Sequence, residues 1–244
     1  MPRLQSVVIN YIKRTKASYS QIILQIQKQW RRDISKGLVS YYKGSRTGRI
    51  KQFYKGKISQ AEWDWLVGLY YSDGCKFKDR YHYTVVFTLS TNEKAIIDKL
   101  ILILTTMGLK AGTYRKKNKK AVDIKTSSKQ FFSALPSKEE NYSPHSPLAY
   151  LAGLFDGDGF IGRHKSGEKW IFTQARYPHL VQQVIDITKP YGRVSLRIIY
   201  HPNSKSKPTH KVLFLKETRV ALLKNEFQKH SVRCKLVVGR AGLS

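Results

Sequence analysis

The chain contains two nonapeptides that are near copies of one another. Leu66 to Gly74 reads LVGLYYSDG, and Leu151 to Gly159 reads LAGLFDGDG. The copies are offset by 85 residues (151 minus 66). A repeat with a period of this size indicates that the fold is built from two related units. The 244 residues accommodate two such units and a further segment in front of them.

Both copies show the apolar spacing of an α-helix. The apolar positions are Leu66, Leu69 and Tyr70 in the first copy and Leu151, Leu154 and Phe155 in the second. Each predicted helix also has a glycine in its interior, Gly68 or Gly153, which costs about 1 kcal/mol relative to alanine. Two backbones that cross too closely for a side chain would compensate this cost. We therefore expect the two helices to pack against each other.

Each copy ends with an aspartate and a glycine, Asp73-Gly74 and Asp158-Gly159. We expect each glycine to end its helix in the left-handed conformation. The aspartates then lie at the negative end of a helix dipole, and pairing of the helices brings their carboxylates together. Two like charges at such a place favour a bound cation, and oxygen ligands suit Mg²⁺ or a similar hard ion.

The two nonapeptides resemble the signature of the LAGLIDADG homing endonucleases, in the monomeric form with two motifs in one chain. The element order extends the resemblance over about residues 61–240. It implies an α+β fold of two pseudo-symmetric αββαββα halves around parallel motif helices, with antiparallel sheets that form a saddle over DNA. It also implies that Asp73 and Asp158 bind a catalytic Mg²⁺ or Mn²⁺, joined by the backbone carbonyls of Ser72 and Gly157.

The resemblance implies further polar residues that orient water and screen the phosphate. Gln174, at the inner end of a predicted strand, fits this place in the second half, whereas the matching stretch Phe87 to Ser90 has no glutamine. Lys138 and Lys235 follow the last predicted helix of their halves, and we assign both to the active site. The two active sites are therefore expected to be unequal.

Asp156 also lies in the second motif, but the corresponding residue of the first motif is Tyr71. We therefore expect a local structural role for Asp156 rather than a catalytic one. The two cysteines, Cys75 and Cys234, are too few for a zinc knuckle or a disulfide framework.

The activity that the resemblance implies is a metal-dependent double-strand break in a long pseudo-palindromic DNA site, leaving 3′ overhangs, as in intron homing. Hydrolysis of a phosphodiester needs an activated water and a stabilised leaving oxygen, and metal ions supply both.

Two alternatives stay open: an RNA-binding splicing maturase without nuclease activity, and a DNA-binding regulator. An acid at both eighth motif positions argues for the nuclease. We expect a monomer that needs no protein partner and acts on double-stranded DNA, with RNA as the partner of a maturase.

The charge of the chain favours the same class of partner. It has 45 Lys and Arg against 16 Asp and Glu, a net charge of +29. Such a charge points to a polyanion, because neutralising phosphates releases counterions. The basic residues alternate with apolar ones instead of lining one amphipathic helix, so a membrane surface is disfavoured. With no apolar run of about 18 residues and no signal-peptide core, we expect an intracellular, cytoplasmic protein, and an organellar host stays open as the alternative.

Residues 1–60 are expected to form a basic N-terminal DNA-binding extension. They contain 14 Lys and Arg and one acid, Asp33, a net charge of +13 (14 minus 1). Their apolar spacing predicts three short helices in a helix-turn-helix arrangement, and a basic arm docked on the core is the alternative. The halves that follow are expected at 61–143 and 144–244, with a linker at Pro136–Pro147.

The same order of elements is predicted twice. In the first half the motif helix is followed by strands and helices at Cys75–Lys78, Tyr81–Leu89, Asn92–Gly108, Thr113–Thr126 (a hairpin) and Lys129–Leu135. In the second half it is followed by Ile161–Arg163, Trp170–Gln174, Pro178–Thr188, Arg193–Tyr200, Lys211–Leu215 and a final helix at Thr218–Lys229.

Strands with one apolar and one polar face suit contact with the major groove of DNA. The residues expected to bind DNA are Lys76, Lys78, Arg80, Arg115, Lys117, Lys119, Arg163, Lys165, Arg176, Arg193, Arg197, Lys205, Lys207, Arg31, Arg32, Arg46 and Arg49.

Overall fold

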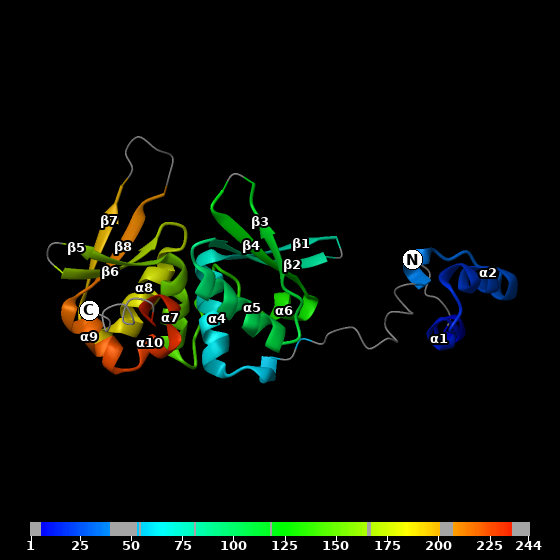
Figure 1. The fold of residues 1–244 in the computed structure, drawn as a ribbon, viewed down its shortest axis with the longest axis horizontal. Coiled ribbons are helices and arrows are strands. Elements are labelled where there is room, and N and C mark those ends of the chain that lie inside the picture. Colours follow the sequence, from blue (N-terminus) through cyan, green and yellow to red (C-terminus); the bar gives the residue numbers. More distant parts are fainter. Residues whose placement is uncertain are drawn as a thin grey trace. The chain divides into compact units, whose positions relative to one another are not determined.

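The computed structural model describes residues 6–39, 53, 55–80, 82–117, 119–164, 167–200 and 207–235. The chain divides into two compact units, Met1–Gln52 and Phe53–Ser244 (Figure 1). Phe53 belongs to the second unit because its ring packs against Trp63 and Phe131 and its N–H donates to Gln130. The first unit therefore ends before residue 60, where the sequence placed the boundary.

The first unit contains helices α1 (Ser6–Arg14) and α2 (Tyr19–Trp30) and a helical turn at 36–39. Ser18 and Gln21 form a reciprocal capping box that fixes the start of α2. The unit has a small core of its own, made of Val8, Ile12, Ile22, Ile26 and Val39. Two of the three expected helices are thus confirmed, and the rest of the predicted third one, within 40–52, lies outside the described residues.

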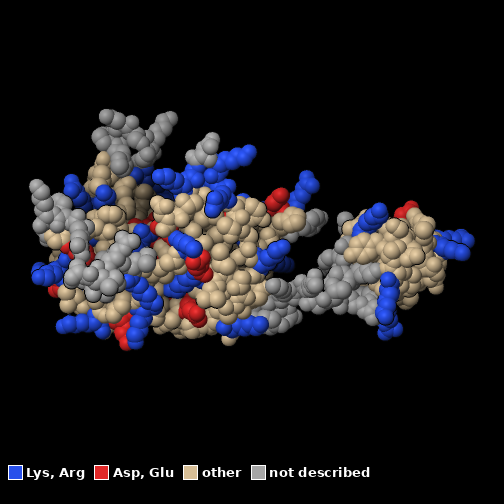
Figure 2. Space-filling view, in the orientation of Figure 1, with Lys and Arg blue, Asp and Glu red and all other residues tan. Residues whose placement is uncertain are grey.

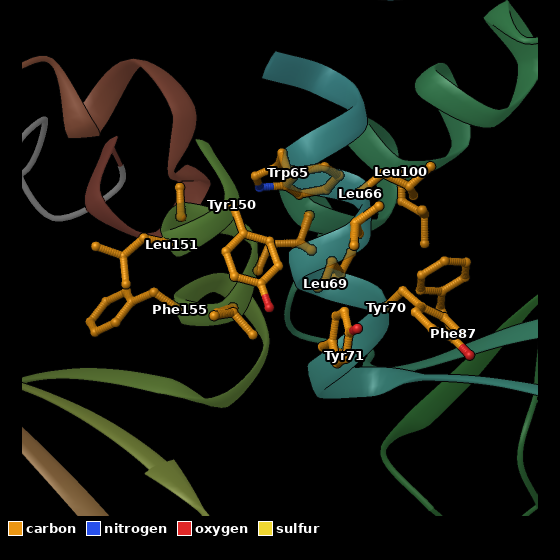
Figure 3. Packing of buried hydrophobic residues seen from close by; sticks show 14 of the residues in the cluster. Trp65, Leu66, Leu69, Tyr70, Tyr71, Phe87, Leu100, Tyr150, Leu151 and Phe155 are labelled. Atoms are coloured by element: carbon orange, nitrogen blue, oxygen red, sulfur yellow. The ribbon is translucent and has the colours of Figure 1, made fainter. Parts of the chain in front are cut away.

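The centre of the second unit is a pair of helices, α4 (Gln60–Asp73) and α7 (Pro147–Asp158), that pack side by side. A capping box of Ser59 and Glu62 starts α4, and Pro147 occupies the first turn of α7. Figure 3 shows side chains on the sides of α4 and α7 that face away from each other. Tyr70 points to Phe87 in the first half, and Phe155 points away from α4 into the second half. Each motif helix therefore belongs to the core of its own half and to the interface between the halves.

The two interior glycines lie where the motif helices cross. A Cβ added to Gly68 would lie 2.2 Å from the carbonyl oxygen of Tyr150, and one added to Gly153 would lie 2.0 Å from that of Trp65. Both distances are far below any contact that a real Cβ makes. The prediction that the glycines allow a close crossing of two backbones is confirmed.

Each motif helix is followed by the same succession of elements (Figure 1). The first half contains β1 (Gly74–Asp79), β2 (His82–Ser90), α5 (Lys94–Thr106), β3 (Gly112–Arg115), β4 (Ala121–Ser127) and α6 (Lys129–Ala134). The second half contains β5 (Gly159–His164), β6 (Gly167–Gln174), α8 (Pro178–Thr188), β7 (Val194–Ile199), β8 (Thr209–Phe214), α9 (Lys216–Lys224) and α10 (Phe227–His230). The expected α+β fold of two αββαββα halves is thus confirmed.

The strands form two antiparallel sheets of the same topology, β1-β2-β4-β3 and β5-β6-β8-β7. Gly74 pairs with Phe87 in the first sheet, and Gly159 pairs with Phe172 in the second. Both pairs keep the offset of 85 residues (159 minus 74; 172 minus 87). The register of β1 and β2 is therefore repeated without a shift in β5 and β6.

Each sheet packs one face on the helices of its half and leaves the other face open (Figure 1). On β2 the buried side chains of Val85, Phe87 and Leu89 mark the packed face. We call the opposite face the outer face. It includes the exposed rings of Phe77, Tyr114 and Phe160.

The glycines that end the motifs are not left-handed caps, contrary to expectation. Gly74 has φ −88° and Gly159 has φ −87°, both extended. Each glycine begins a strand directly, and the chain folds back so tightly that a Cβ would lie 2.6 Å from the carbonyl oxygen of Tyr70 or 2.2 Å from that of Phe155. Lack of space, rather than a positive φ, requires glycine at both positions.

The single helix expected at Thr218–Lys229 is wrong as well. The structure has α9 and α10 there, separated at Glu226, whose φ is 68°. The break brings the ring of Phe227 into the core, where it packs against Phe155 and Trp170. A further helical turn follows at 232–235.

Within the described part of the chain, no helix is both long and apolar enough to pass through a membrane.

The crossing of the motif helices predicts the effect of adding one methyl group. Gly68→Ala and Gly153→Ala should each lower the free energy of unfolding by at least about 2 kcal/mol, because a Cβ would collide with a rigid carbonyl. Gly56→Ala is the matched control, since nothing lies within 4 Å of a Cβ at that position. Urea denaturation of the three variants measures the difference, and equal stabilities would contradict the close crossing.

Candidate functional site

The site is built at the C-terminal ends of α4 and α7, where Asp73 and Asp158 are the last residues. A Cβ on Gly157 would lie 2.9 Å from Oδ2 of Asp73 and 2.4 Å from Cβ of Ser72. The Asp73 carboxylate therefore lies against the residue that precedes Asp158. The crossing of the helices brings the two aspartates together, one from each half.

Both carboxylates are unfavourable in their charged form. Burial, and after it the charges of Asp158 and Glu93, raise the pKa of Asp73 to about 7, while Arg233 and Lys138 oppose the shift. Burial also raises the pKa of Asp158 to about 6, against the effects of Lys138, the Gln174 amide and Arg233. The C-terminal ends of the dipoles of α4 and α7 add to this negative potential.

Gln174, the last residue of β6, holds one of these carboxylates. Its Nε2 donates to Oδ2 of Asp158 at 3.0 Å, while its Oε1 accepts the backbone N–H groups of Ala175 and Arg176 at 3.0 and 2.8 Å. These backbone bonds fix the orientation of the amide. In the first half the offset of 85 places the buried Leu89 at the corresponding position, and no described residue donates to Asp73.

Lys138 lies beside the same carboxylates. Its Nζ donates to the carbonyl oxygen of Tyr71 at 2.9 Å and lies over the rings of Tyr70 and Tyr177. Burial lowers its pKa to about 8, which leaves it mostly protonated at neutral pH. The Tyr71 hydroxyl donates to the carbonyls of Ser137 and Glu140 and so fixes the segment that carries Lys138.

In the second half the corresponding cation is Arg233, which the sequence reasoning missed. Its Nη2 donates to the carbonyl oxygen of Asp156 at 2.7 Å and to that of Gly157 at 3.4 Å, and it pairs with Glu93 of the first half at 2.6 Å. Residues 71 and 156 are equivalent (156 minus 71 is 85). Lys138 therefore binds the carbonyl of Tyr71 in the first half, and Arg233 binds the equivalent carbonyl of Asp156 in the second. Lys235 is exposed, and its charge acts on Lys99 and His230 instead.

The buried Asp156 holds the segment that carries Arg233. Its carboxylate accepts the indole N–H of Trp65 at 2.8 Å, the hydroxyl of Ser231 at 2.7 Å, and the backbone N–H groups of Val232 and Arg233 at 2.9 and 3.0 Å. Asp156 thus caps the helical turn at 232–235. The geometry fits the local role that the sequence suggested.

The residues around the two aspartates fit a hard divalent cation. Two desolvated carboxylates lie together, one of them has no hydrogen-bond donor among the described residues, and backbone carbonyls of two helix ends lie beside them. The carbonyl oxygen of Gly157 accepts a hydrogen bond from Arg233. The Ser72 hydroxyl donates to the carbonyl oxygen of Leu154. Among the residues described there is no group of three or more His, Cys, Asp or Glu side chains that could hold a metal, so carbonyl, water or phosphate oxygens would have to complete the set.

The expected DNA-binding residues are distributed unevenly between the two faces of the sheets. Arg197 lies on the outer face, paired across from Lys211. Lys76 lies on the other face, where its Nζ donates to the carbonyls of Phe132 and Leu135 at the end of α6. The register also places Lys78 and Arg115 opposite to the outer face.

The other residues expected to bind DNA lie at the margins of the sheets, in the first unit, or outside the described residues. Arg80, Lys117, Lys119, Arg176, Arg193 and Lys207 lie in turns and loops next to strands. Arg31 and Arg32 are exposed at the end of α2 in the first unit. The positions of Lys165, Lys205, Arg46 and Arg49, and the side chain of Arg163, lie outside the described residues.

Four lysines of the outer face were missed, namely Lys116, Lys125, Lys169 and Lys211. A signal for three of them exists in the sequence, because Lys125, Lys169 and Lys211 alternate with core residues of their strands. Figure 2 shows Lys and Arg outnumbering Asp and Glu over the visible face of the second unit, including the edge that the sheets form.

Neither a protein-family model nor a curated protein sequence matches the chain. Solved structures do match. I-DmoI with its target DNA nicked in the coding strand, in the presence of Mn, is 15% identical over 70% of this chain and 98% of that chain, with a TM-score of 0.50. I-DmoI in complex with DNA and Mn is 15% identical over 68% of this chain and 95% of that chain, with a TM-score of 0.48. The N-terminal LAGLIDADG domain of DUF199/WhiA is 16% identical over 73% of this chain and 87% of that chain, with a TM-score of 0.49.

The raised pKa values of the aspartates predict a pH-dependent stability in a chelator. Between about pH 4 and pH 7 the folded state holds protons that the unfolded state has released, so the free energy of unfolding should fall as the pH rises through this window. At pH 8, Asp73→Asn should therefore be more stable than the wild type, by about 2 kcal/mol or more.

Thermal unfolding at pH 5 and pH 8 measures this difference. Added Mg²⁺ should raise the melting temperature of the wild type at pH 8 and that of Asp73→Asn much less, because the variant lacks one of the two carboxylates. Asp98→Asn, at an exposed position of α5, is the control and should keep the wild-type response. A wild type that is equally stable at both pH values would contradict the assignment.

Proposed function

From the premise that this chain has the LAGLIDADG fold, we propose that it is a metal-dependent endonuclease. It makes a double-strand break in a long pseudo-palindromic DNA site and leaves 3′ overhangs, in the service of intron homing. The observation that carries the proposal is the pair Asp73 and Asp158: two desolvated carboxylates, one from each half, held together at the junction of two open basic sheets. I-DmoI, whose structures include target DNA and Mn, supports the same combination of partners.

The residues around the aspartates have separable roles in this proposal. Asp73 and Asp158 bind Mg²⁺ or Mn²⁺, with the backbone carbonyls of Ser72 and Gly157 beside them. The bound ion supplies activation of a water and stabilisation of the leaving oxygen. Gln174 keeps one Asp158 oxygen in place. Lys138 and Arg233 place a positive charge on each side of the carboxylates, where a scissile phosphate has to approach.

The sheets supply the DNA-binding surface. The outer face of each sheet begins directly at the catalytic end of its motif helix, because β1 and β5 start at the residue after the aspartate. Duplex DNA lying along both outer faces therefore passes over the aspartates. One half serves each strand, since the halves are related by pseudo-symmetry.

The two active sites are unequal in this proposal. Asp158 has the Gln174 amide, whereas Leu89 offers no donor to Asp73. Strand cleavage by the second half therefore depends on an amide that has no equivalent in the first.

Cleavage of DNA tests the proposal. The wild-type protein should linearise plasmids that carry the sequence flanking its encoding intron, in the presence of Mg²⁺ or Mn²⁺. Asp73→Asn and Asp158→Asn should each abolish the double-strand break while DNA binding stays within about threefold, because removal of a carboxylate also removes repulsion of the phosphate. Specific binding of intact DNA by the wild type under all these conditions would point to the regulator, and binding of intron RNA alone would point to the maturase.

The same assay, read separately for each strand, tests the inequality of the sites. Gln174→Ala should slow one strand more than the other. Gln182→Ala, on the exposed side of α8, is the matched control and should slow neither. Equal slowing of both strands by Gln174→Ala would count against the proposed asymmetry.

The first unit is proposed to add affinity for DNA rather than chemistry. It has its own core, its exposed side chains include Lys28, Arg32 and Lys36, and Asp33 is its only described acid. Without a cluster of acids it offers no second metal site among these residues, but its cations can neutralise phosphates.

Neutralising these cations should therefore weaken binding without moving the cleavage positions. In full-length protein, replacing Lys28, Arg32 and Lys36 by Gln should make the dependence of log K on log salt shallower by about 0.9 for each phosphate that the variant no longer neutralises. The control replaces three exposed lysines on the helical side of the second unit, Lys94, Lys189 and Lys224. If both triple variants keep the wild-type slope, the first unit does not lie on the DNA.

A further inference from the structure

The outer faces of the two sheets carry different chemistry at equivalent positions. Thr88 of β2 and Thr173 of β6 are equivalent (173 minus 88 is 85) and lie next to the motif ends. Thr88 pairs with Asp123 of β4, which pairs with Tyr114 of β3. Thr173 pairs with Lys211 of β8, which pairs with Arg197 of β7. We call these two sets the central rows; one contains an acid where the other contains a base.

Asp123 is held firmly in the first central row. Its Oδ1 accepts the Thr88 hydroxyl at 2.8 Å and contacts Nζ of Lys116 at 3.1 Å, while Nζ of Lys125 lies 3.7 Å from Oδ2. Burial opposes ionisation, but the Thr88 hydrogen bond and the two lysines keep the pKa of Asp123 below its ordinary value. The carboxylate is therefore charged, oriented and fixed at the centre of the outer face.

Lys116 and Lys125 offset the repulsion between the Asp123 carboxylate and the phosphates of DNA. Lys116, Lys125 and Asp123 together carry a net charge of +1, so the cluster as a whole attracts phosphate. A carboxylate has about four acceptor sites, and the three neighbours do not use all of them. The Asp123 side chain keeps 13% of its surface exposed, which leaves an acceptor for one group that approaches from the DNA side.

The two charged residues of the second central row, Lys211 and Arg197, are donors only. Arg197 is exposed and Lys211 is half-buried, and neither has an acidic partner among the described residues. Lysine and arginine donate to acceptors and accept nothing. The charged groups of the two rows therefore favour different base edges.

The neighbouring rows differ as well. In the first sheet Cys75, Val86 and Lys125 lie in line, and in the second sheet Phe160, Ile171 and Leu213 occupy these positions. Phe160 is 57% exposed. The second half thus presents an apolar row, of the kind that contacts thymine methyl groups, where the first half presents a lysine.

We propose that the central rows determine specificity at one pair of symmetry-related base pairs, and that the DNA target departs from palindromy there. Asp123 accepts the N4 amino group of cytosine in the major groove, and Lys211 with Arg197 donates to O6 and N7 of guanine. The inference rests on the proposed DNA-binding function and adds to it which residues distinguish the two half-sites.

Selection from a random-sequence duplex library tests this directly. Full-length protein carries Asp73→Asn throughout, so that bound duplexes stay intact. With no further change it should select cytosine at one position and guanine at its symmetry mate, each half-site read outward from the centre. Asp123→Lys should shift the first preference to guanine, and Lys211→Asp should shift the second to cytosine. Each shift should be at least about fivefold, which corresponds to about 1 kcal/mol.

A milder substitution and two charge controls keep the test decisive. Asp123→Asn preserves the size of the side chain and should shift the first preference toward adenine, since Asn pairs with N6 and N7 of adenine. Asp98→Lys on α5 and Lys224→Asp on α9 make the same charge changes at exposed positions of helices and should leave both base preferences unchanged.

The two possible failures differ. If the protein selects no sequence at all, the proposed function fails. If it selects a site whose base preferences survive Asp123→Lys, Asp123→Asn and Lys211→Asp alike, sequence-specific DNA binding stands and the specificity role of the central rows is overturned, leaving Asp123 as a support for Lys116 and Lys125.

Discussion

The close crossing of α4 and α7 is the contact on which the rest of the structure depends. Gly68 and Gly153 let two backbones approach to distances that exclude a single methyl group. Because the helices run together to their ends, the same contact brings Asp73 and Asp158 to one point. Because a strand begins immediately after each aspartate, it also fixes where both sheets start. Core, site and binding surface therefore share one geometric cause.

Bringing two carboxylates to two helix ends is electrostatically unfavourable, and the surrounding structure is arranged to maintain it. Tyr71 and Asp156 occupy equivalent motif positions. One is a hydrogen-bond donor and the other an acceptor, and each fixes the segment that carries a cation of its half. The Tyr71 hydroxyl donates to carbonyls of the segment that carries Lys138. The Asp156 carboxylate accepts N–H groups of the segment that carries Arg233. Each half thus delivers one cation to the aspartates. Because Arg233 also pairs with Glu93, one negative charge remains at the site for a bound cation.

The two halves keep one backbone plan and differ in the side chains that face the substrate. The register of β1 and β2 is repeated without a shift in β5 and β6, yet Gln174 corresponds to Leu89, and Lys211 corresponds to Asp123. Residues that hold the fold have equivalents in both halves, as Gly68 and Gly153 show. A duplicated scaffold with divergent contact residues is suited to a substrate that is itself nearly, but not fully, symmetric.

The sequence by itself determined the repeat, the paired helices, the order of strands and helices, and the placement of both aspartates, because each depends on local periodicity or on a motif. It also placed Gln174, since the end of a strand is visible as the end of an alternating pattern. Only the tertiary structure decided which cation of the second half reaches the aspartates. The chain breaks at Glu226 to bury Phe227, and this turn brings Arg233 rather than Lys235 to the site. Only strand pairing decided which face a basic residue occupies, so that Lys76 caps α6 while Lys211 lies on the outer face. The extended Gly74 and Gly159 have the same explanation, because the space that excludes a Cβ there is set by how tightly the chain folds back and not by the local sequence.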